Sequence, residues 1–182
     1  TTGDGNTLVG YVAGDALDGG YNNVGIGLFA LSDEIEGRGS TAVGVSALQS
    51  QSNAGGADTL NTAVGFYAGN IVSTGTNNTC TSGYNCVVGH LAGEEMVGAS
   101  HNTFIGTYAG QETTAGFSNT FVGMSTGITN TNGDKNCIVG NYSDTAVADA
   151  NGANGIGYNL NCVAGYTTLG DTGDDIRAAH GN

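Results

Sequence analysis

The chain contains no proline and no tryptophan, and only three of its 182 residues are lysine or arginine. With a formal net charge of −13, it lacks the basic patches by which proteins bind nucleic-acid phosphates or anionic membrane surfaces. No apolar run reaches the roughly 18 residues of a membrane-spanning helix. No basic-then-apolar signal segment opens the chain. We therefore expect neither nucleic-acid binding nor membrane insertion.

Glycine accounts for 34 of the 182 residues and interrupts every stretch that would otherwise suit a helix. No long window has the 3.6-residue periodicity of an amphipathic helix. The only helix-like fragments are short, at 145–150 and 176–180. The apolar positions keep a strict register, which a disordered low-complexity chain does not. These features predict an ordered, all-β protein.

A valine or isoleucine followed by glycine recurs nine times at the same point of a repeating frame. The intervals between these anchor glycines are 17, 17, 21, 24, 17, 17, 17 and 17 residues. A period near twenty is typical of a solenoid of small stacked units. We expect about nine coils of parallel stacked short strands, a rod of roughly 43 Å at about 4.8 Å per coil. The anchor glycines are Gly10, Gly27, Gly44, Gly65, Gly89, Gly106, Gly123, Gly140 and Gly157.

Other positions are nearly as regular when the anchor glycine is counted as position 0, and the consensus reads Asn-Thr-x-Val-Gly-x-x-Ala-Gly. Position +3 is alanine in six repeats, and position −3 is mostly threonine, with Cys86 and Cys137 as replacements of similar size. Asparagine side chains hydrogen-bond backbone groups of turns, so stacked asparagines at position −4 are expected to form a ladder. Asparagine occupies that position seven times, as Asn6, Asn23, Asn61, Asn85, Asn102, Asn119 and Asn136.

The strand Thr-x-Val is apolar on both faces, which indicates burial on both faces. Successive side chains of a strand point to opposite sides, so positions −3 and −1 share one face. Because that face is uniformly small or β-branched, we expect it to line the interior of the coil. Position −2, which includes Phe104 and Phe121, would then face outward. One thin coil buries only one face, so copies of the same chain are expected to cover the other.

Two insertions, at 49–60 and 71–84, interrupt the frame and account for the longer intervals. Insertions in a solenoid form loops on one side, often the binding side. The frame changes after Gly157, and 161–165 is a partial repeat. We therefore divide the chain into a repetitive fibre domain at 1–165 and a cap or exit segment at 166–182.

The acidic side chains lie between the strands, where solvated turns are expected. Neither of the two densest acidic groups has the spacing of an EF-hand loop, so we expect no cofactor, although Ca²⁺, which needs several oxygens, stays a weak alternative. These groups are Asp33/Glu34/Glu36 and Asp171/Asp174/Asp175.

The four cysteines form no CxxC pair, which argues against a zinc ribbon or a redox motif. Cys86, Cys137 and Cys162 are expected to be small buried residues. Cys80 precedes Cys86 by six residues and could close a loop with it. The disulfide state of the four stays open at this stage.

Three histidines are present, and each stands alone in the sequence, without a carboxylate or nucleophile at useful spacing. His90 falls at an outward position +1, His101 precedes a strand and His180 is in the tail. The glycine-rich stretches precede no helix that could receive a phosphate. We therefore expect no catalytic residues, no metal ligands and no enzyme activity.

The strand motif, as in Asn102-Thr103-Phe104-Ile105-Gly106, resembles the repeats of two groups of trimeric fibrous proteins. One is the β-roll head of trimeric autotransporter adhesins, whose repeat is usually shorter and places its asparagine one position earlier. The other is the Asn-Thr-x-Ile-Gly-x-x-Ala-Gly repeat of phage tail fibres. The segment 168–182 is similar to the stretch that leads into an endosialidase-type intramolecular chaperone, which cleaves itself off. This resemblance implies a homotrimeric β-prism fibre and a mature, cleaved product.

We therefore expect a phage tail fibre segment, located in the virion or an extracellular appendage, that projects or mediates recognition of a host-surface glycan or protein. Aromatic faces suit sugar rings, although packing between chains would explain outward aromatics equally well. The candidate contact residues are Tyr11, Phe66, Tyr67, Tyr108 and Tyr142.

Three alternatives stay open. A bacterial trimeric adhesin head would share the architecture and differ in genomic context. A glycan-cleaving spike would need paired carboxylates in a groove, which one chain's sequence does not reveal. A monomeric ice- or Ca²⁺-binding repeat protein would present a regular, exposed threonine face, and the expected burial of the threonine column argues against it.

Overall fold

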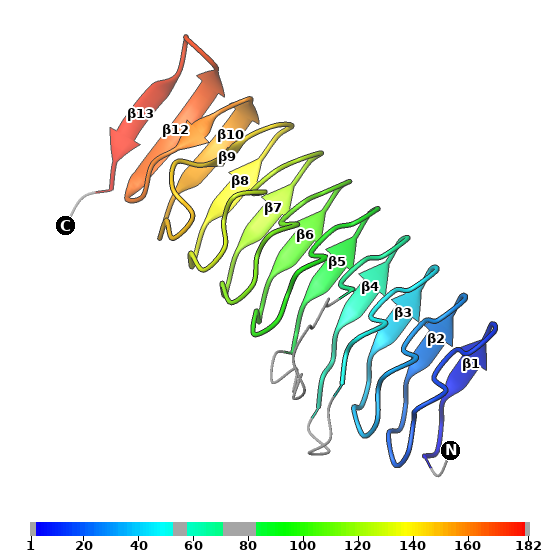
Figure 1. The fold of residues 1–182 in the computed structure, drawn as a ribbon. Coiled ribbons are helices and arrows are strands. Elements are labelled where there is room, and N and C mark those ends of the chain that lie inside the picture. The colour runs from blue at the N-terminus through cyan, green and yellow to red at the C-terminus, as the bar shows by residue number, and fades with distance from the viewer. Residues whose placement is uncertain (1–2, 53–57, 71–82, 181–182) are drawn as a thin grey trace.

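The computed structural model describes residues 3–52, 58–70 and 83–180. They form an all-β, parallel β-solenoid of about nine coils, as the repeat predicted. The stack is elongated, with the first and last strands at opposite ends (Figure 1). Residues 53–57 of the insertion at 49–60 and residues 71–82 of the insertion at 71–84 lie outside the described residues.

One eleven-stranded sheet runs the length of the rod, in the order β1-β2-β3-β4-β5-β6-β7-β8-β10-β12-β13, and β9 and β11 form a separate parallel pair. All pairs in the long sheet are parallel except β12 with β13. The strands are β1 (Thr7–Val9), β2 (Val24–Ile26), β3 (Thr41–Val43), β4 (Thr62–Val64), β5 (Cys86–Val88), β6 (Thr103–Ile105), β7 (Thr120–Val122), β8 (Cys137–Val139), β9 (Asp144–Thr145), β10 (Asn154–Tyr158), β11 (Asn161–Cys162), β12 (Tyr166–Asp171) and β13 (Ile176–Ala179).

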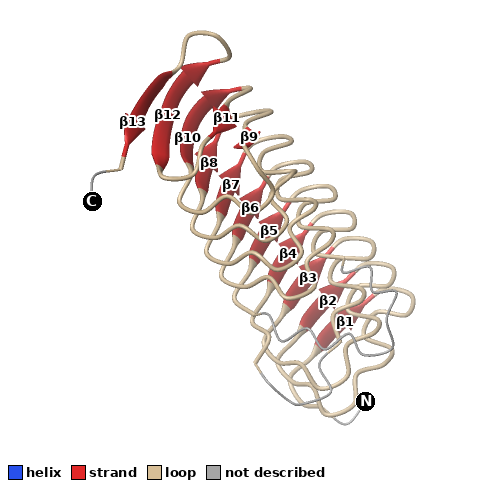
Figure 2. Ribbon diagram, turned by 60° about the vertical axis from the view of Figure 1, so that its left-hand side comes forward, coloured by secondary structure: helices blue, strands red, loops and turns tan. Residues whose placement is uncertain are grey.

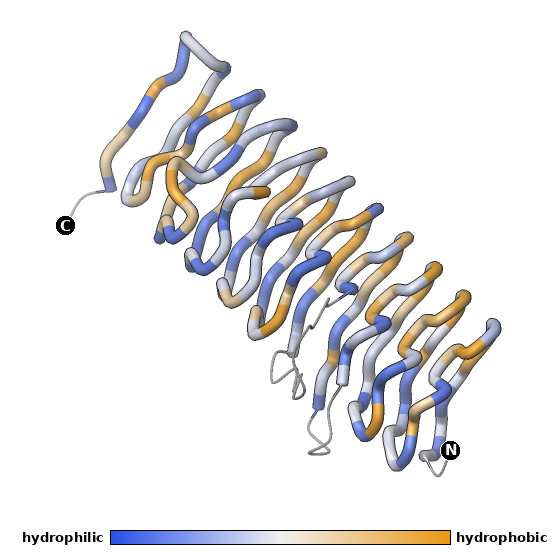
Figure 3. Tube along the Cα trace, in the orientation of Figure 1, coloured by the Kyte–Doolittle hydropathy of each residue, from blue (hydrophilic) through white to orange (hydrophobic). Residues whose placement is uncertain are grey.

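The pairing keeps equal frame positions side by side. Phe104 of β6 pairs with Phe121 of β7, and Ile105 pairs with Val122. A slip of one residue would move every side chain to the opposite face. Frame positions therefore become columns along the rod, and the strands form one continuous side of it (Figure 2). Hydropathy recurs at the same places from coil to coil (Figure 3).

The expected orientation of the strands is wrong, and the structure reverses it. Position −2 points into the coil: Phe104, Phe121 and Ile138 are fully buried. Positions −3 and −1 point outward, and Ile105 stays 40% exposed. Alternation alone cannot show which face is interior when both faces are apolar. The face with uniformly small or β-branched side chains, at positions −3 and −1, proves to be the outer one.

Side chains of different sizes fit at position −2 because the size of the side chain at position +4 of the same coil compensates for the difference. The coils with Gly25 and Ala42 have a leucine, Leu31 or Leu48, at +4, and both leucines are buried. The coil with Phe104 has Gly110, whose added Cβ would lie 2.7 Å from the Phe104 ring. Native interiors are close-packed, so in these coils the two positions compensate each other in size. In the coil where both are small, with Ala63 and Gly69, side chains of neighbouring coils, Leu48 and Met96, approach the space beside Gly69.

The anchor glycines allow the coils to stack at strand spacing. All nine have positive φ, for example +139° at Gly106 and +134° at Gly123, which side-chain-bearing residues rarely adopt. A Cβ on Gly106 would also collide with the carbonyl oxygen of Gly123 in the next coil. Glycine is thus required both by conformation and by the close approach of the next backbone.

The asparagines at position −4 form a buried ladder between coils. Asn119 accepts a hydrogen bond at Oδ1 from the backbone N–H of Asn136, at 3.0 Å. Its Nδ2 donates to the carbonyl of Gly133, at 2.7 Å. The same arrangement recurs at Asn23, Asn85, Asn102 and Asn136. The ladder satisfies backbone groups where the chain enters each strand, because unpaired buried groups are costly.

Ser40 interrupts the ladder, and Gln51 restores it from the interior. Ser40 Oγ is too short to reach as far as an asparagine, and the N–H of Asn61 lies 3.4 Å from it. The Gln51 amide fills the gap: Nε2 donates to Ser40 Oγ at 3.1 Å, and Oε1 accepts from Asn61 Nδ2 at 2.7 Å. Gln51 is fully buried, so the insertion that contains it contributes a core residue.

The two fragments noted as helix-like are not helices. In the described part of the chain the backbone forms only strands, turns and bends. Within 145–150, Thr145 ends strand β9 and the following residues form bends and a turn. The other fragment contains β13, which pairs antiparallel with β12. Strand pairing here overrides weak local helix preference, as tertiary context commonly does.

Candidate functional surfaces

The outward side of the long sheet, which we call the sheet face, consists of positions −3 and −1 of the nine coils. None of its eighteen residues is charged, although the chain has 3 basic and 16 acidic residues. None of them is buried. The −3 column is Thr7, Val24, Thr41, Thr62, Cys86, Thr103, Thr120, Cys137 and Asn154, and the −1 column is Val9, Ile26, Val43, Val64, Val88, Ile105, Val122, Val139 and Ile156.

A sheet face of this kind is unusual on a lone soluble chain. Nine exposed or half-exposed valines and isoleucines lie in one straight column, because the strands pair in register. Contiguous apolar surface of this extent usually marks an interaction site. The absence of charge removes the desolvation cost that burying such a face would otherwise carry.

Two cysteines occupy this face, contrary to expectation. Cys137 is exposed and Cys86 half-exposed, whereas Cys162 is buried as predicted. The three described cysteines are free thiols. Burial raises the pKa of the Cys162 thiol to about 11. The proposed loop closure by Cys80 concerns a residue outside the described ranges.

The aromatic residues proposed for surface contact occupy positions +1 and +2, in the turn directly after each strand. These turns stack along one edge of the rod. Tyr11 packs edge-on against Phe29, with 6.4 Å between ring centroids. Tyr142 packs edge-on against Tyr158, at 5.9 Å. The remaining three, Phe66, Tyr67 and Tyr108, belong to a third and larger group.

That third group includes a histidine that the sequence analysis treated as isolated. Phe66 contacts Tyr67, with centroids 4.4 Å apart, and stacks on His90 at 5.5 Å. His90 in turn packs edge-on against Tyr108, at 5.4 Å. We call Phe66, Tyr67, His90 and Tyr108 the aromatic corner. The sequence feature that could have placed His90 in this group is its frame position: it lies at position +1, as Phe66 does, one coil later.

The other two histidines also contact neighbours. His101 stacks on Tyr84, with 5.0 Å between centroids and 18° between the ring planes. His180 Nε2 lies 3.0 Å from Thr167 Oγ1 and 3.2 Å from Asn154 Nδ2, at the C-terminal end of the sheet. Neither contact involves a carboxylate, and the contacts of His180 are with a threonine hydroxyl and an asparagine amide among exposed residues.

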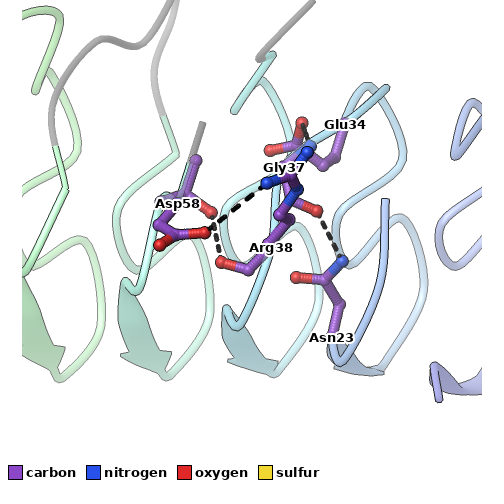
Figure 4. A network of polar contacts seen from close by, with 6 residues as sticks. Asn23, Glu34, Gly37, Arg38 and Asp58 are labelled. Atoms are coloured by element: carbon purple, nitrogen blue, oxygen red, sulfur yellow. Dashed lines mark hydrogen bonds and ion pairs between the residues drawn. The ribbon is translucent and has the colours of Figure 1, made fainter. Parts of the chain in front are cut away.

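The first proposed calcium group is divided between the interior and the surface. Glu34 is fully buried, whereas Asp33 is exposed. The Glu34 carboxylate accepts hydrogen bonds from the N–H groups of Ile35 and Gly37, at 3.0 and 2.8 Å, and from Gln51. Figure 4 shows Glu34 turned toward Gly37, whose carbonyl oxygen accepts a hydrogen bond from Asn23. Its oxygens are directed at protein donors within the coil.

Figure 4 also shows Arg38 beside Asp58, where the closest nitrogen–oxygen distance is 4.0 Å. Arg38 additionally covers the ring of Tyr21, at 4.7 Å. In the second acidic group, Asp175 pairs with Arg177. Within residues 3–52, 58–70 and 83–180, no three His, Cys, Asp or Glu side chains gather as metal ligands would.

Asp144 is a half-buried carboxyl group whose surroundings shift its pKa. Burial raises the pKa above its ordinary value, and hydrogen bonds from the backbone N–H groups of Thr129 and Thr145 partly oppose that shift. The bonds measure 3.0 and 2.8 Å. Asp144 begins strand β9, and these two hydrogen bonds connect its carboxylate to the backbone of two neighbouring coils.

The C-terminal hairpin contains a shallow pocket of about 330 Å³, lined by Val163, Tyr166 and Arg177. The guanidinium of Arg177 is already engaged by Asp175. No helix in the described part of the chain has the length and apolar character needed to cross a membrane. The sheet face and the aromatic corner are therefore the surfaces with the clearest functional character.

Comparison with known proteins gives no match: no family profile, no curated protein and no solved structure is significantly similar to this chain.

Proposed function

We propose that the protein is a structural and adhesive fibre segment, formed by three copies of the chain that join through their sheet faces. The observation that carries this proposal is the uncharged sheet face, with an exposed or half-exposed valine or isoleucine at position −1 of all nine coils. The sequence resemblance to trimeric phage fibres and adhesin heads supports three copies in particular. In this setting the protein projects from a virion or cell surface and contacts the host.

A second copy of the same chain is the partner that fits this face best. The columns repeat at the strand spacing of about 4.8 Å, and an identical rod has the same spacing and the same length. Cyclic symmetry closes such an assembly without leaving an unsatisfied copy of the interface. The apolar columns would then form a central core, and the acidic loops would stay in solvent.

The structure changes the way in which this assembly is tested. Phe104 and Phe121 were expected to face outward, but aspartates in their place would put charges inside the coil and disrupt the fold. The corresponding outward residues are Ile105 and Val122. We expect Ile105→Asp plus Val122→Asp to give a folded single chain, because aspartates on the sheet face oppose its burial but do not disturb the interior.

Light scattering on the native chain and this variant tests the proposal. The matched control, Ala115→Asp plus Asn132→Asp, adds the same two charges to exposed loops of the same two coils. We expect a mass of three chains for the native protein and the control, and one chain with an unchanged circular dichroism spectrum for the sheet-face variant. A native mass of one chain would overturn the assembly.

One observation favours a second candidate, a monomer that orders water and binds ice. The threonine column at position −3 is not buried, so the earlier argument against this function no longer holds. Five threonines, at Thr7, Thr41, Thr62, Thr103 and Thr120, alternate with the Val/Ile column on a regular sheet. This candidate predicts a single-chain mass together with thermal hysteresis, a depression of the freezing point below the melting point, that disappears in the Ile105→Asp plus Val122→Asp variant.

A further inference from the structure

The aromatic corner joins three successive coils into one continuous surface of rings. Phe66 and Tyr67 come from the coil of β4, His90 from that of β5 and Tyr108 from that of β6. The consecutive centroid distances of 4.4, 5.5 and 5.4 Å leave no gap between neighbouring rings. At about 4.8 Å per coil, the cluster extends about 10 Å along the rod.

These rings are not buried by the rest of the chain. Phe66 is 47% exposed, His90 is exposed, and Tyr67 and Tyr108 are half-exposed. Within the part of the chain that the structure describes, no hydrogen bond engages the hydroxyl group of Tyr67 or of Tyr108. The corner thus combines accessible ring faces with free hydroxyl groups.

The backbone at this corner would suit smaller residues better. Tyr67 and Tyr108 have φ values of +56° and +60°, a left-handed conformation that is an outlier for bulky residues and that glycine or asparagine adopts more easily. Large rings placed in such a conformation, without being buried, gain little for the fold. The same left-handed conformation occurs at position +2 of all nine coils, with φ between +52° and +60°, so it belongs to the repeat and not to the corner alone.

The charge around the corner restricts the ligand. Positions +1 and +2 contain no charged residue in any of the nine coils, in a chain with a net charge of −13. An anionic ligand would approach against the overall negative potential. An uncharged ligand avoids that repulsion and meets a surface that needs no carboxylate desolvation.

We propose that the aromatic corner binds a neutral oligosaccharide on the host surface. Sugar rings have an apolar C–H face that suits an aromatic face, and hydroxyl groups that can bond to Tyr67 and Tyr108. Rings with an apolar body and a polar tip are common at such interfaces. The row of rings follows the rod axis, so an extended chain of sugars can contact several coils. The proposal rests on the adhesive function proposed above and names its ligand.

The test is affinity electrophoresis of the native full chain through gels containing dextran, mannan, galactomannan or xyloglucan, with alginate as the anionic comparison. We expect at least one neutral polysaccharide to retard the protein and alginate to have no effect. Phe66→Ala plus Tyr108→Ala should weaken that binding at least tenfold. The control, Phe117→Ala plus Tyr158→Ala, removes one exposed phenylalanine ring and one exposed tyrosine ring outside the corner and should leave the binding unchanged.

The absence of tryptophan provides a second measurement. Phe66→Trp introduces a single indole at the corner, and its emission should shift to shorter wavelength when the retarding polysaccharide is added. Retardation by none of the neutral polysaccharides, equal weakening in the control, or an unchanged indole emission would each overturn the proposal.

Light scattering on the same samples separates this proposal from the proposed assembly. Dissociation of the Phe66→Ala plus Tyr108→Ala variant into single chains would show that the corner is a contact between subunits and would overturn glycan binding there. A single-chain native protein that still binds a neutral polysaccharide through these rings would refute the assembly and leave the binding site standing.

Discussion

The rings of Phe104 and Phe121 lie parallel in the interior of the rod, with centroids 5.2 Å apart and 5° between their planes. They occupy the same frame position in successive coils and pair directly across β6 and β7. Each faces a glycine at position +4, Gly110 or Gly127, that leaves room for it. Stacking in register thus turns a sequence repeat into a continuous packed core.

Phe121→Ala should lower the free energy of unfolding by about 3–5 kcal/mol, because it removes a fully buried ring and leaves a cavity. Gly127→Leu alone should also destabilise the fold, since a side chain there meets the Phe121 ring. The two substitutions together should recover part of the loss, because Ala42 and Leu48 already form such a pair. Urea unfolding measures all three variants, and simple additivity of the two losses would contradict shared volume.

Asn119→Ala should lower the free energy of unfolding by about 1–3 kcal/mol, the usual cost of a buried group left without a partner. The group in question is the backbone N–H of Asn136, which Asn119 Oδ1 accepts at 3.0 Å. Asn132→Ala, at an exposed asparagine, is the control and should change stability by less than about 0.5 kcal/mol. Equal losses would show that the ladder contributes little.

Asp144→Asn should stabilise the protein more at pH 7 than at pH 4, relative to the native chain. Burial raises the pKa of Asp144 in the folded state, so folding favours the protonated carboxyl. Its stabilising contribution is fully present below the ordinary value of 3.8 and is lost as the pH rises through the folded-state pKa. Urea unfolding between pH 4 and pH 7 measures how the free energy of unfolding of each protein changes with pH.

The control for this pH dependence is Asp149→Asn, which removes one carboxylate from an exposed position of the same coil. It lowers the net negative charge by the same amount without removing a buried carboxyl group. A stability difference that grew equally with pH in both variants would reflect the net charge of the chain and not the burial of Asp144.

Alkylation of thiols should distinguish Cys162 from Cys137. In a Cys80→Ser background at pH 8, iodoacetamide should leave Cys162 unmodified until the protein unfolds, because the thiol is buried and its pKa is about 11. Cys137 lies on the sheet face and should react readily in the single-chain Ile105→Asp plus Val122→Asp variant and slowly in the assembled native protein. Mass spectrometry of peptides gives both rates, and equal rates at Cys137 would place the interface elsewhere.

The position of the contact residues could be inferred from the frame, but their grouping could not. Phe66, Tyr67 and Tyr108 share the outward positions +1 and +2, which the sequence indicated. Only the stacking of coils shows that His90, 24 residues after Phe66, completes a continuous cluster with them. Side-chain contact depends on the spacing of coils across an insertion, and the frame alone does not specify it.

The sequence by itself determined the architecture: nine anchor glycines and seven asparagines specify the number of coils, the parallel register and the ladder, because each is required wherever one backbone closely approaches the next. The tertiary structure alone decided which apolar face is interior. Two-residue alternation defines two faces without ranking them, and only the closed coil, with position +4 filling the space beside position −2, has room for Phe104 inside and places Ile105 outside.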